Sequence, residues 1–124
     1  MNTVQLTKRE FNFKVSELND KEHWAYLGER PCVIDFYTSW CTPCKKIAPL
    51  LEDIAIEYAN YVDVYKINAD EEPELAAAFG VKCLPTLVFC PMIENPHIIE
   101  GTLSMTELVD QVESLLIKEE LYAG

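Results

Sequence analysis

The sequence predicts an α/β protein built around a mixed β-sheet. Residues 32–37 form a run of β-branched, aromatic and other apolar side chains that is typical of a buried parallel strand. From about Thr42 the apolar residues recur at helical spacing, and helical and strand-like segments then alternate along the chain. This order, strand–helix–strand–helix–strand–strand–helix, predicts helices packed against a central sheet.

The N-terminal elements are short. Residues 4–6 are predicted to form an edge strand, and Thr7 with Glu10 has the spacing of a helix capping box. Apolar residues follow at helical intervals, and we expect residues 19–20 to end this helix. We interpret residues 24–27 as a further short strand. The apolar residues of the predicted helix are Phe11, Val15 and Leu18.

The central elements have clearer patterns. The helix that begins near Thr42 has an apolar stripe with acidic residues on the opposite side. Residues 62–67 alternate as a strand, and Pro73 opens a short helix that continues to Ala78, with Gly80 as its stop signal. The apolar stripe consists of Ile47, Leu50, Leu51, Ile54, Ala55 and Tyr58.

The last part of the chain contains two strands and a helix. Thr86–Cys90 and His97–Glu100 are predicted to pair antiparallel, because the loop between them is short. Ser104 and Glu107 repeat the capping-box pattern and open the final helix. Its apolar face consists of Leu108, Val112, Leu115 and Leu116.

Length and charge restrict the possible function classes. The 124 residues, 49% of them hydrophobic, predict one domain over residues 1–124, with a variable N-terminal region at 1–31 and the core at 32–120. The net charge of −11 argues against nucleic-acid and anionic-membrane partners. No apolar stretch is long enough for a membrane span, and the polar N-terminus resembles no secretory signal. We therefore expect a cytoplasmic monomer.

The most specific functional pattern is Cys41-Thr42-Pro43-Cys44, where a strand passes into a helix. Unpaired N–H groups and the helix dipole favour a thiolate at a helix N-terminus, and thiolate is the nucleophile of thiol–disulfide exchange. We assign Cys41 as the attacking thiol. Cys44 lies one helical turn later on the same face, so it is assigned to attack the mixed disulfide and release the substrate.

Two other interpretations of this cysteine pair fit less well. A zinc site would need a second pair, and Cys83 and Cys90 are separated by six residues in a strand-like segment. A static disulfide would be unusual in a reducing cytoplasm. We therefore predict a redox function and no metal site.

Asp35 is the polar residue of an otherwise apolar strand, six residues before Cys41. If it is buried, its pKa should rise, and it could exchange protons with Cys44 while the disulfide forms and breaks. Lys66, in the neighbouring strand, is its natural partner if both side chains point inward. A solvent-facing acid on an edge strand is the alternative, and the residues alone leave both interpretations open.

Several separated motifs lie along the chain: Asp35-Phe36-Tyr37, Trp40-Cys41-x-Pro43-Cys44-Lys45, Pro49 in the helix, Lys66-x-Asn68-x-Asp70, Gly80-Val81-Lys82-Cys83-Leu84-Pro85-Thr86, and Gly101. Together these motifs resemble the thioredoxin family. They extend from about Val33 to Leu116, most of the chain, at spacings similar to those of the family. The resemblance implies the thioredoxin fold, a central mixed β-sheet with helices on both faces, and protein-disulfide reductase activity.

The resemblance also implies roles for individual residues. Asp35 corresponds to the buried acid of the family and Lys66 to its lysine neighbour. The bond between Leu84 and Pro85 is expected to be cis and to face the active disulfide. Substrates are expected to dock on a shallow apolar surface lined by Trp40, Thr42, Pro43, Leu84, Pro85 and Gly101.

The resemblance implies a redox-active Cys41–Cys44 disulfide without a bound cofactor. Disulfide-containing proteins would be the substrates, and the role would be cell redox homeostasis. Electrons would come from NADPH through a separate flavoprotein, thioredoxin reductase.

Two other functions remain as alternatives. Thr42 replaces the glycine usual in the family, and the residues between the cysteines influence redox poise, so a disulfide oxidant or isomerase of an exported compartment is one of them. A non-catalytic binding subunit is the other, motivated by the acidic second part of the chain, where residues 47–124 carry a net charge of −12.

The other three cysteines have separate interpretations. Cys83, two residues before Pro85, is expected on the rim of the docking surface and is a candidate regulatory thiol for glutathionylation or an intermolecular disulfide. The simpler interpretation, which we favour, is a small, partly buried apolar residue. Cys32 and Cys90 lie in apolar strands and are expected in the core.

Overall fold

A computed structural model describes residues 2–18 and 23–117 of the chain. In this part, five strands form one mixed sheet in the order β1-β3-β2-β4-β5. Strands β1, β3 and β2 are parallel, whereas β4 is antiparallel to both β2 and β5. The α/β fold predicted from the sequence is thus confirmed. The strands are β1 (Val4–Gln5), β2 (Cys32–Tyr37), β3 (Asp63–Asn68), β4 (Thr86–Cys90) and β5 (His97–Glu100).

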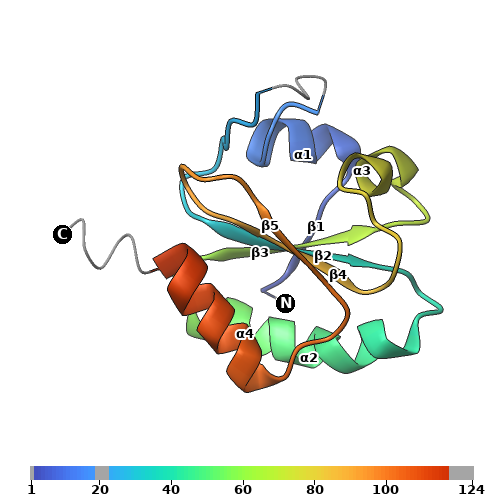
Figure 1. Cartoon of the computed structure of the whole chain (residues 1–124), viewed down its shortest axis with the longest axis vertical. Helices are drawn as coiled ribbons and strands as arrows, with labels where there is room; N and C mark the ends of the chain where they lie inside the picture. Colours follow the sequence, from blue (N-terminus) through green and yellow to red (C-terminus); the bar gives the residue numbers. More distant parts are fainter. Residues whose placement is uncertain (1, 19–22, 118–124) are drawn as a thin grey trace.

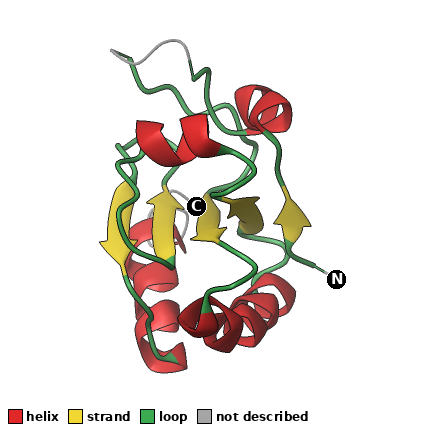
Figure 2. Cartoon of the chain, turned by 90° about the vertical axis from the view of Figure 1, so that its right-hand side faces the viewer, coloured by secondary structure: helices red, strands yellow, loops and turns green. Residues whose placement is uncertain are grey.

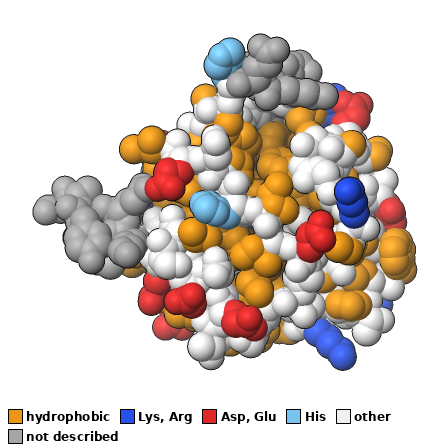
Figure 3. All heavy atoms as spheres, viewed as in Figure 1, with side chains coloured by type: hydrophobic (Ala, Val, Ile, Leu, Met, Phe, Trp, Pro, Cys, Tyr) orange, Lys and Arg blue, Asp and Glu red, His pale blue; other side chains and the backbone are white. Residues whose placement is uncertain are grey.

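Helices cover both faces of the sheet, as Figures 1 and 2 show. Helices α1 (Lys8–Lys14) and α3 (Pro73–Ala78) lie on one face, and α2 (Thr42–Glu57) and α4 (Met105–Gln111) lie on the other. Helix α4 continues as a π-helical segment, Val112–Ile117. None of the described helices is long and apolar enough to cross a membrane. Figure 3 shows acidic side chains spread over the viewed face of the molecule.

The central strand β2 separates two hydrophobic cores, and this explains its nearly continuous apolar sequence. Val33 faces the core under α2 and α4, together with Ile47 and Leu108. Ile34 and Phe36 face the core under α1 and α3. Alternate residues of a strand point to opposite faces, so a strand covered on both sides needs apolar residues at nearly every position. Asp35 is therefore exceptional.

Both predicted capping boxes are present. The hydroxyl of Thr7 accepts a hydrogen bond from the backbone of Glu10, and Ser104 accepts one from Glu107. However, α1 ends at Lys14, so the prediction that it extends to residues 19–20 is wrong; those two residues lie outside the described part of the chain. The side chain of Asn12 accepts a hydrogen bond from the Leu18 N–H at 2.8 Å. The Leu18 N–H therefore has a side-chain partner in place of a helical backbone carbonyl.

Residues 24–27 do not form the predicted strand. Trp24 and Tyr26 pack instead against the core under α1 and α3. The Leu27 N–H donates to the carbonyl of Val15 at 2.8 Å, which ties the segment to the end of α1 and not to the sheet. The alternation of the segment therefore reflects a covering loop with aromatic side chains turned inward.

Candidate active site

Cys41 and Cys44 lie at the turn from β2 into α2. Cys41 is the N-cap of α2, with an extended backbone, and Cys44 is inside the first turn. Pro43 also lies in this turn, where the missing N–H of proline costs no helical hydrogen bond. The predicted strand-to-helix junction is thus confirmed.

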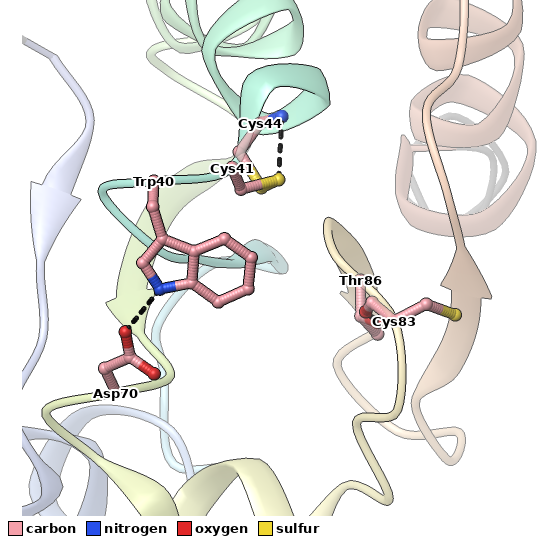
Figure 4. Close-up of a disulfide and its surroundings, with 6 residues drawn as sticks. All are labelled: Trp40, Cys41, Cys44, Asp70, Cys83 and Thr86. Atoms are coloured by element: carbon pink, nitrogen blue, oxygen red, sulfur yellow. Dashed lines mark hydrogen bonds between the residues drawn. A yellow bond between two sulfur atoms is a disulfide. The ribbon is translucent and has the colours of Figure 1, made fainter.

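The two cysteines form a disulfide with a Cα–Cα distance of 5.3 Å. The backbone N–H of Cys44 donates a hydrogen bond to Sγ of Cys41 at 3.2 Å (Figure 4). After reduction, this donor and the positive end of the helix dipole would stabilise negative charge on Cys41. The arrangement therefore favours a reactive thiolate at Cys41.

Asp35 is fully buried in the central strand β2, so the alternative of a solvent-facing acid on an edge strand is wrong. Within the described residues, neither carboxylate oxygen has a hydrogen-bond partner. Burial raises the pKa of Asp35 from 3.8 to about 7, although the nearby charge of Lys66 lowers it in part. Asp35 can therefore take up and release a proton near neutral pH.

Asp35 and Cys44 share one layer of the molecule. Asp35 lies on the same side of β2 as Val33, whose side chain packs in the core under α2. Cys44 is on the buried side of α2, one turn before Ile47 of that core. The structure thus places the carboxyl group and the cysteine between the sheet and the same helix.

Lys66 lies directly opposite Asp35 in the register of β2 and β3. Its ammonium group lies over the ring of Tyr37, 4.6 Å from the ring centroid. Lys66 therefore acts on Asp35 through its charge and not through a direct hydrogen bond.

The expected docking residues differ in exposure. Trp40 is 67% exposed, Thr42 and Pro43 are also exposed, and Leu84 is half-buried. Thr42 and Pro43 line a groove between α2 and the segment before α4, and Trp40 and Leu84 line a second groove next to α3. The disulfide therefore lies between two grooves.

The other two expected docking residues are joined to each other. Pro85 is buried, and its peptide bond with Leu84 is cis. Gly101 has a φ angle of 90°, a conformation that favours glycine, and its N–H donates to the carbonyl of Pro85 at 2.8 Å. The carbonyl of Pro85 therefore already accepts a hydrogen bond, and proline has no N–H to donate to a docked chain.

Sequence reasoning placed Asp70 in a motif but assigned no individual role to it. Its carboxylate accepts a hydrogen bond from Nε1 of Trp40 at 2.8 Å (Figure 4). The side chain of Asn68 in turn accepts a hydrogen bond from the Asp70 N–H at 2.9 Å. The sequence did contain a signal for this contact. Both residues come at the carboxyl end of β3, and the turn from β2 to α2 lies at the same edge of the sheet.

Cys83 is exposed, which contradicts the interpretation that we favoured, a partly buried apolar residue. Its thiol donates a hydrogen bond to the carboxylate of Glu100 at 3.2 Å, and this interaction raises the pKa of the thiol. Figure 4 shows the sulfur of Cys83 directed away from the Cys41–Cys44 disulfide.

Among the described residues, no group of three or more His, Cys, Asp and Glu side chains could hold a metal ion.

The sequence model of the thioredoxin family matches residues 2–114. The chain belongs to the thioredoxin family. It is 38% identical to a thioredoxin of Borreliella burgdorferi over 100 residues, which are 81% of this chain and 86% of the relative. It is 33% identical to a thioredoxin of Synechocystis over 103 residues, 83% of this chain and 95% of the relative.

A longer relative is a chloroplastic M-type thioredoxin of Pisum sativum, 35% identical over 118 residues, 93% of this chain and 68% of the relative. Members of the thioredoxin family are disulfide oxidoreductases that act through a redox-active disulfide and need no prosthetic group. This chain is accordingly a thiol–disulfide oxidoreductase, with Cys41 and Cys44 close enough to form the disulfide.

Proposed function

We propose that this chain reduces disulfides in other proteins, with Cys41 as nucleophile and Cys44 as resolving thiol. The observation that carries the proposal is the position of Cys41 at the N-cap of α2, where the Cys44 N–H is directed at its sulfur. The chain's similarity to thioredoxins supports the same chemistry. The two exposed grooves beside the pair are consistent with a protein chain as substrate.

The proposed reaction has two exchange steps. The Cys41 thiolate attacks one sulfur of the substrate disulfide, a mixed disulfide forms, and the other substrate sulfur leaves as a thiolate. Asp35 then takes the proton of Cys44, and the Cys44 thiolate attacks the Cys41 sulfur. This step releases the second substrate thiolate and forms the Cys41–Cys44 disulfide, so two electrons pass to the substrate. A separate reductase then returns two electrons to the pair.

Single cysteine variants test this assignment. Cys44→Ser should accumulate mixed disulfides with a model substrate such as insulin, because no thiol remains to resolve them. Cys41→Ser should form none and should lose reductase activity, although Cys44 is still present. Cys83→Ser is the matched control and should retain activity in this assay. Full activity in Cys41→Ser would refute the assignment of the nucleophile.

The direction of electron flow is part of the proposal and has its own test. Thr42 is exposed beside the disulfide and replaces the family's usual glycine, so a disulfide oxidant is the second candidate. Equilibration of the protein with glutathione measures the potential of the pair. A potential near about −270 mV supports the reductant, and one near about −120 mV supports the oxidant. A reductant also requires a reducing compartment, so we propose the cytoplasm as its location.

A further inference from the structure

Two other cysteines lie opposite each other inside the sheet. Cys32 is the first residue of β2 and Cys90 is the last residue of β4, and the two are direct partners in the antiparallel register. Both are fully buried, and both are free thiols. Residues directly opposite on antiparallel strands project to the same face, here the core under α1 and α3.

The position of this pair suits a disulfide bond. Directly opposed Cα atoms of antiparallel strands lie about 4.5–5.5 Å apart, and disulfides join Cα atoms about 4.4–6.8 Å apart. The register therefore places the two Cα atoms within the range of separations that disulfides join. The neighbouring thiol of Cys32, together with burial, raises the pKa of Cys90.

The pair is covered by a loop. The ring of Tyr26 packs against the core that contains both cysteines, and its hydroxyl lies within hydrogen-bonding reach of Cys32. The same hydroxyl donates to the carbonyl of Arg30. Gly28 lies directly against this ring, because a Cβ at that position would collide with it. The cover has no helix or strand, so it can open without unfolding the sheet.

We propose that Cys32 and Cys90 form a second redox couple, oxidised to a cross-strand disulfide by a small hydroperoxide when Tyr26 moves away. A small oxidant is required because both thiols are fully buried, out of reach of a protein disulfide. The couple is independent of the proposed reductase function. It lies at the other end of β2 from the active site, and that strand of 6 residues spans about 17 Å.

The oxidation is balanced in two steps. The sulfur of one cysteine attacks an oxygen of hydrogen peroxide, the O–O bond breaks, one water leaves, and a sulfenic acid forms. The second sulfur attacks the first, the S–O bond breaks, and a second water leaves. Two electrons and two protons pass from the dithiol to the peroxide, and the product links β2 to β4.

Thiol counting tests the proposal in the intact protein. With Cys41 and Cys44 held as a disulfide, three thiols remain, those of Cys32, Cys83 and Cys90. The Cys83→Ser variant has only two of these thiols and cannot form dimers through the exposed Cys83. The variant is treated with hydrogen peroxide and then denatured, and its number of free thiols should have fallen to zero. Peptide mass mapping should show a Cys32–Cys90 cross-link. Sulfinic acids without a cross-link, or two surviving thiols after prolonged exposure, would refute the proposal.

The rate of cross-link formation tests separately whether Tyr26 limits access to the pair. In the Cys83→Ser background, Tyr26→Ala should speed formation of the cross-link at least several-fold. Tyr61→Ala, which truncates a tyrosine that is 49% exposed elsewhere, should leave the rate unchanged. If Tyr26→Ala does not fold, oxidation of the parent protein in urea below the unfolding transition replaces it, and the rate should rise with urea. A rate that is insensitive to both changes would refute a moving cover.

Discussion

Replacement of Asp35 by asparagine isolates the energetic effect of its buried charge. The substitution keeps the shape of the side chain and removes its titration. In the folded protein the pKa of Asp35 is about 7, because of burial, and its ordinary value is 3.8. Between these two values the unfolded chain releases a proton that the folded protein retains. The free energy of unfolding therefore falls as the pH rises through this window and becomes constant above it.

The size of the effect follows from the two pKa values. A shift of one pKa unit corresponds to about 1.4 kcal/mol, so the shift of Asp35 amounts to about 4 kcal/mol over the whole window. Between pH 5 and pH 9, the free energy of unfolding of the wild type should fall by about 3 kcal/mol relative to that of Asp35→Asn. The variant should therefore be the more stable protein at pH 9, even though its amide also lacks hydrogen-bond partners in this site.

Urea unfolding of the oxidised wild type and Asp35→Asn at pH 5, 7 and 9 measures this difference. When the free energy of unfolding of the variant is subtracted from that of the wild type at each pH, the contributions of the other titrating groups cancel. Asp53→Asn is the matched control for the change from an acid to an amide, because Asp53 is exposed on the outer side of α2. If the wild type and Asp35→Asn differed equally at pH 5 and pH 9, the pKa of Asp35 would not be raised.

Three smaller effects concern other parts of the chain. Glu100→Gln removes the carboxylate that raises the pKa of Cys83, so alkylation of Cys83 by iodoacetamide at pH 8 should become several-fold faster, as measured by mass spectrometry. Thr7→Ala removes the N-cap of α1 and should lower the free energy of unfolding in urea by about 1 kcal/mol. Leu108→Ala opens a cavity in the core under α4 and should lower the free energy of unfolding by about 2–5 kcal/mol in the same assay. An unchanged rate for Glu100→Gln, or equal losses for the other two variants, would contradict these expectations.

The sequence predicted most of the sheet because burial leaves a direct trace in it. Strand β2 is covered on both faces and is therefore apolar at almost every position, whereas α2 is covered on one face and shows a helical stripe. The active-site turn was predictable for a similar reason. Pro43 and the two cysteines come shortly after the buried strand, and proline is favoured in the first turn of a helix.

The segment that contains Trp24 and Tyr26 shows where this reasoning fails. Alternating aromatic residues are consistent with a strand, and they are equally consistent with a loop that turns every second side chain into the core. The difference depends on where the backbone hydrogen bonds go. In the structure, Leu27 bonds to Val15 at the end of α1, a contact that no local pattern encodes. The contact between Trp40 and Asp70 was missed for the same reason, because it joins segments 30 residues apart.

The reactivity of the cysteines in this chain depends on their place in the fold. At Cys41 a helix N-terminus directs an N–H group at the sulfur and favours the thiolate. At Cys90 the neighbouring thiol of Cys32 and burial raise the pKa and favour the protonated form. One chain can therefore hold a reactive dithiol at the N-terminus of α2 and a slower, proposed couple in its core, without exchange between them. The slow couple would respond to sustained oxidation, because its rate depends on the opening of the Tyr26 loop and not on the docking of a substrate.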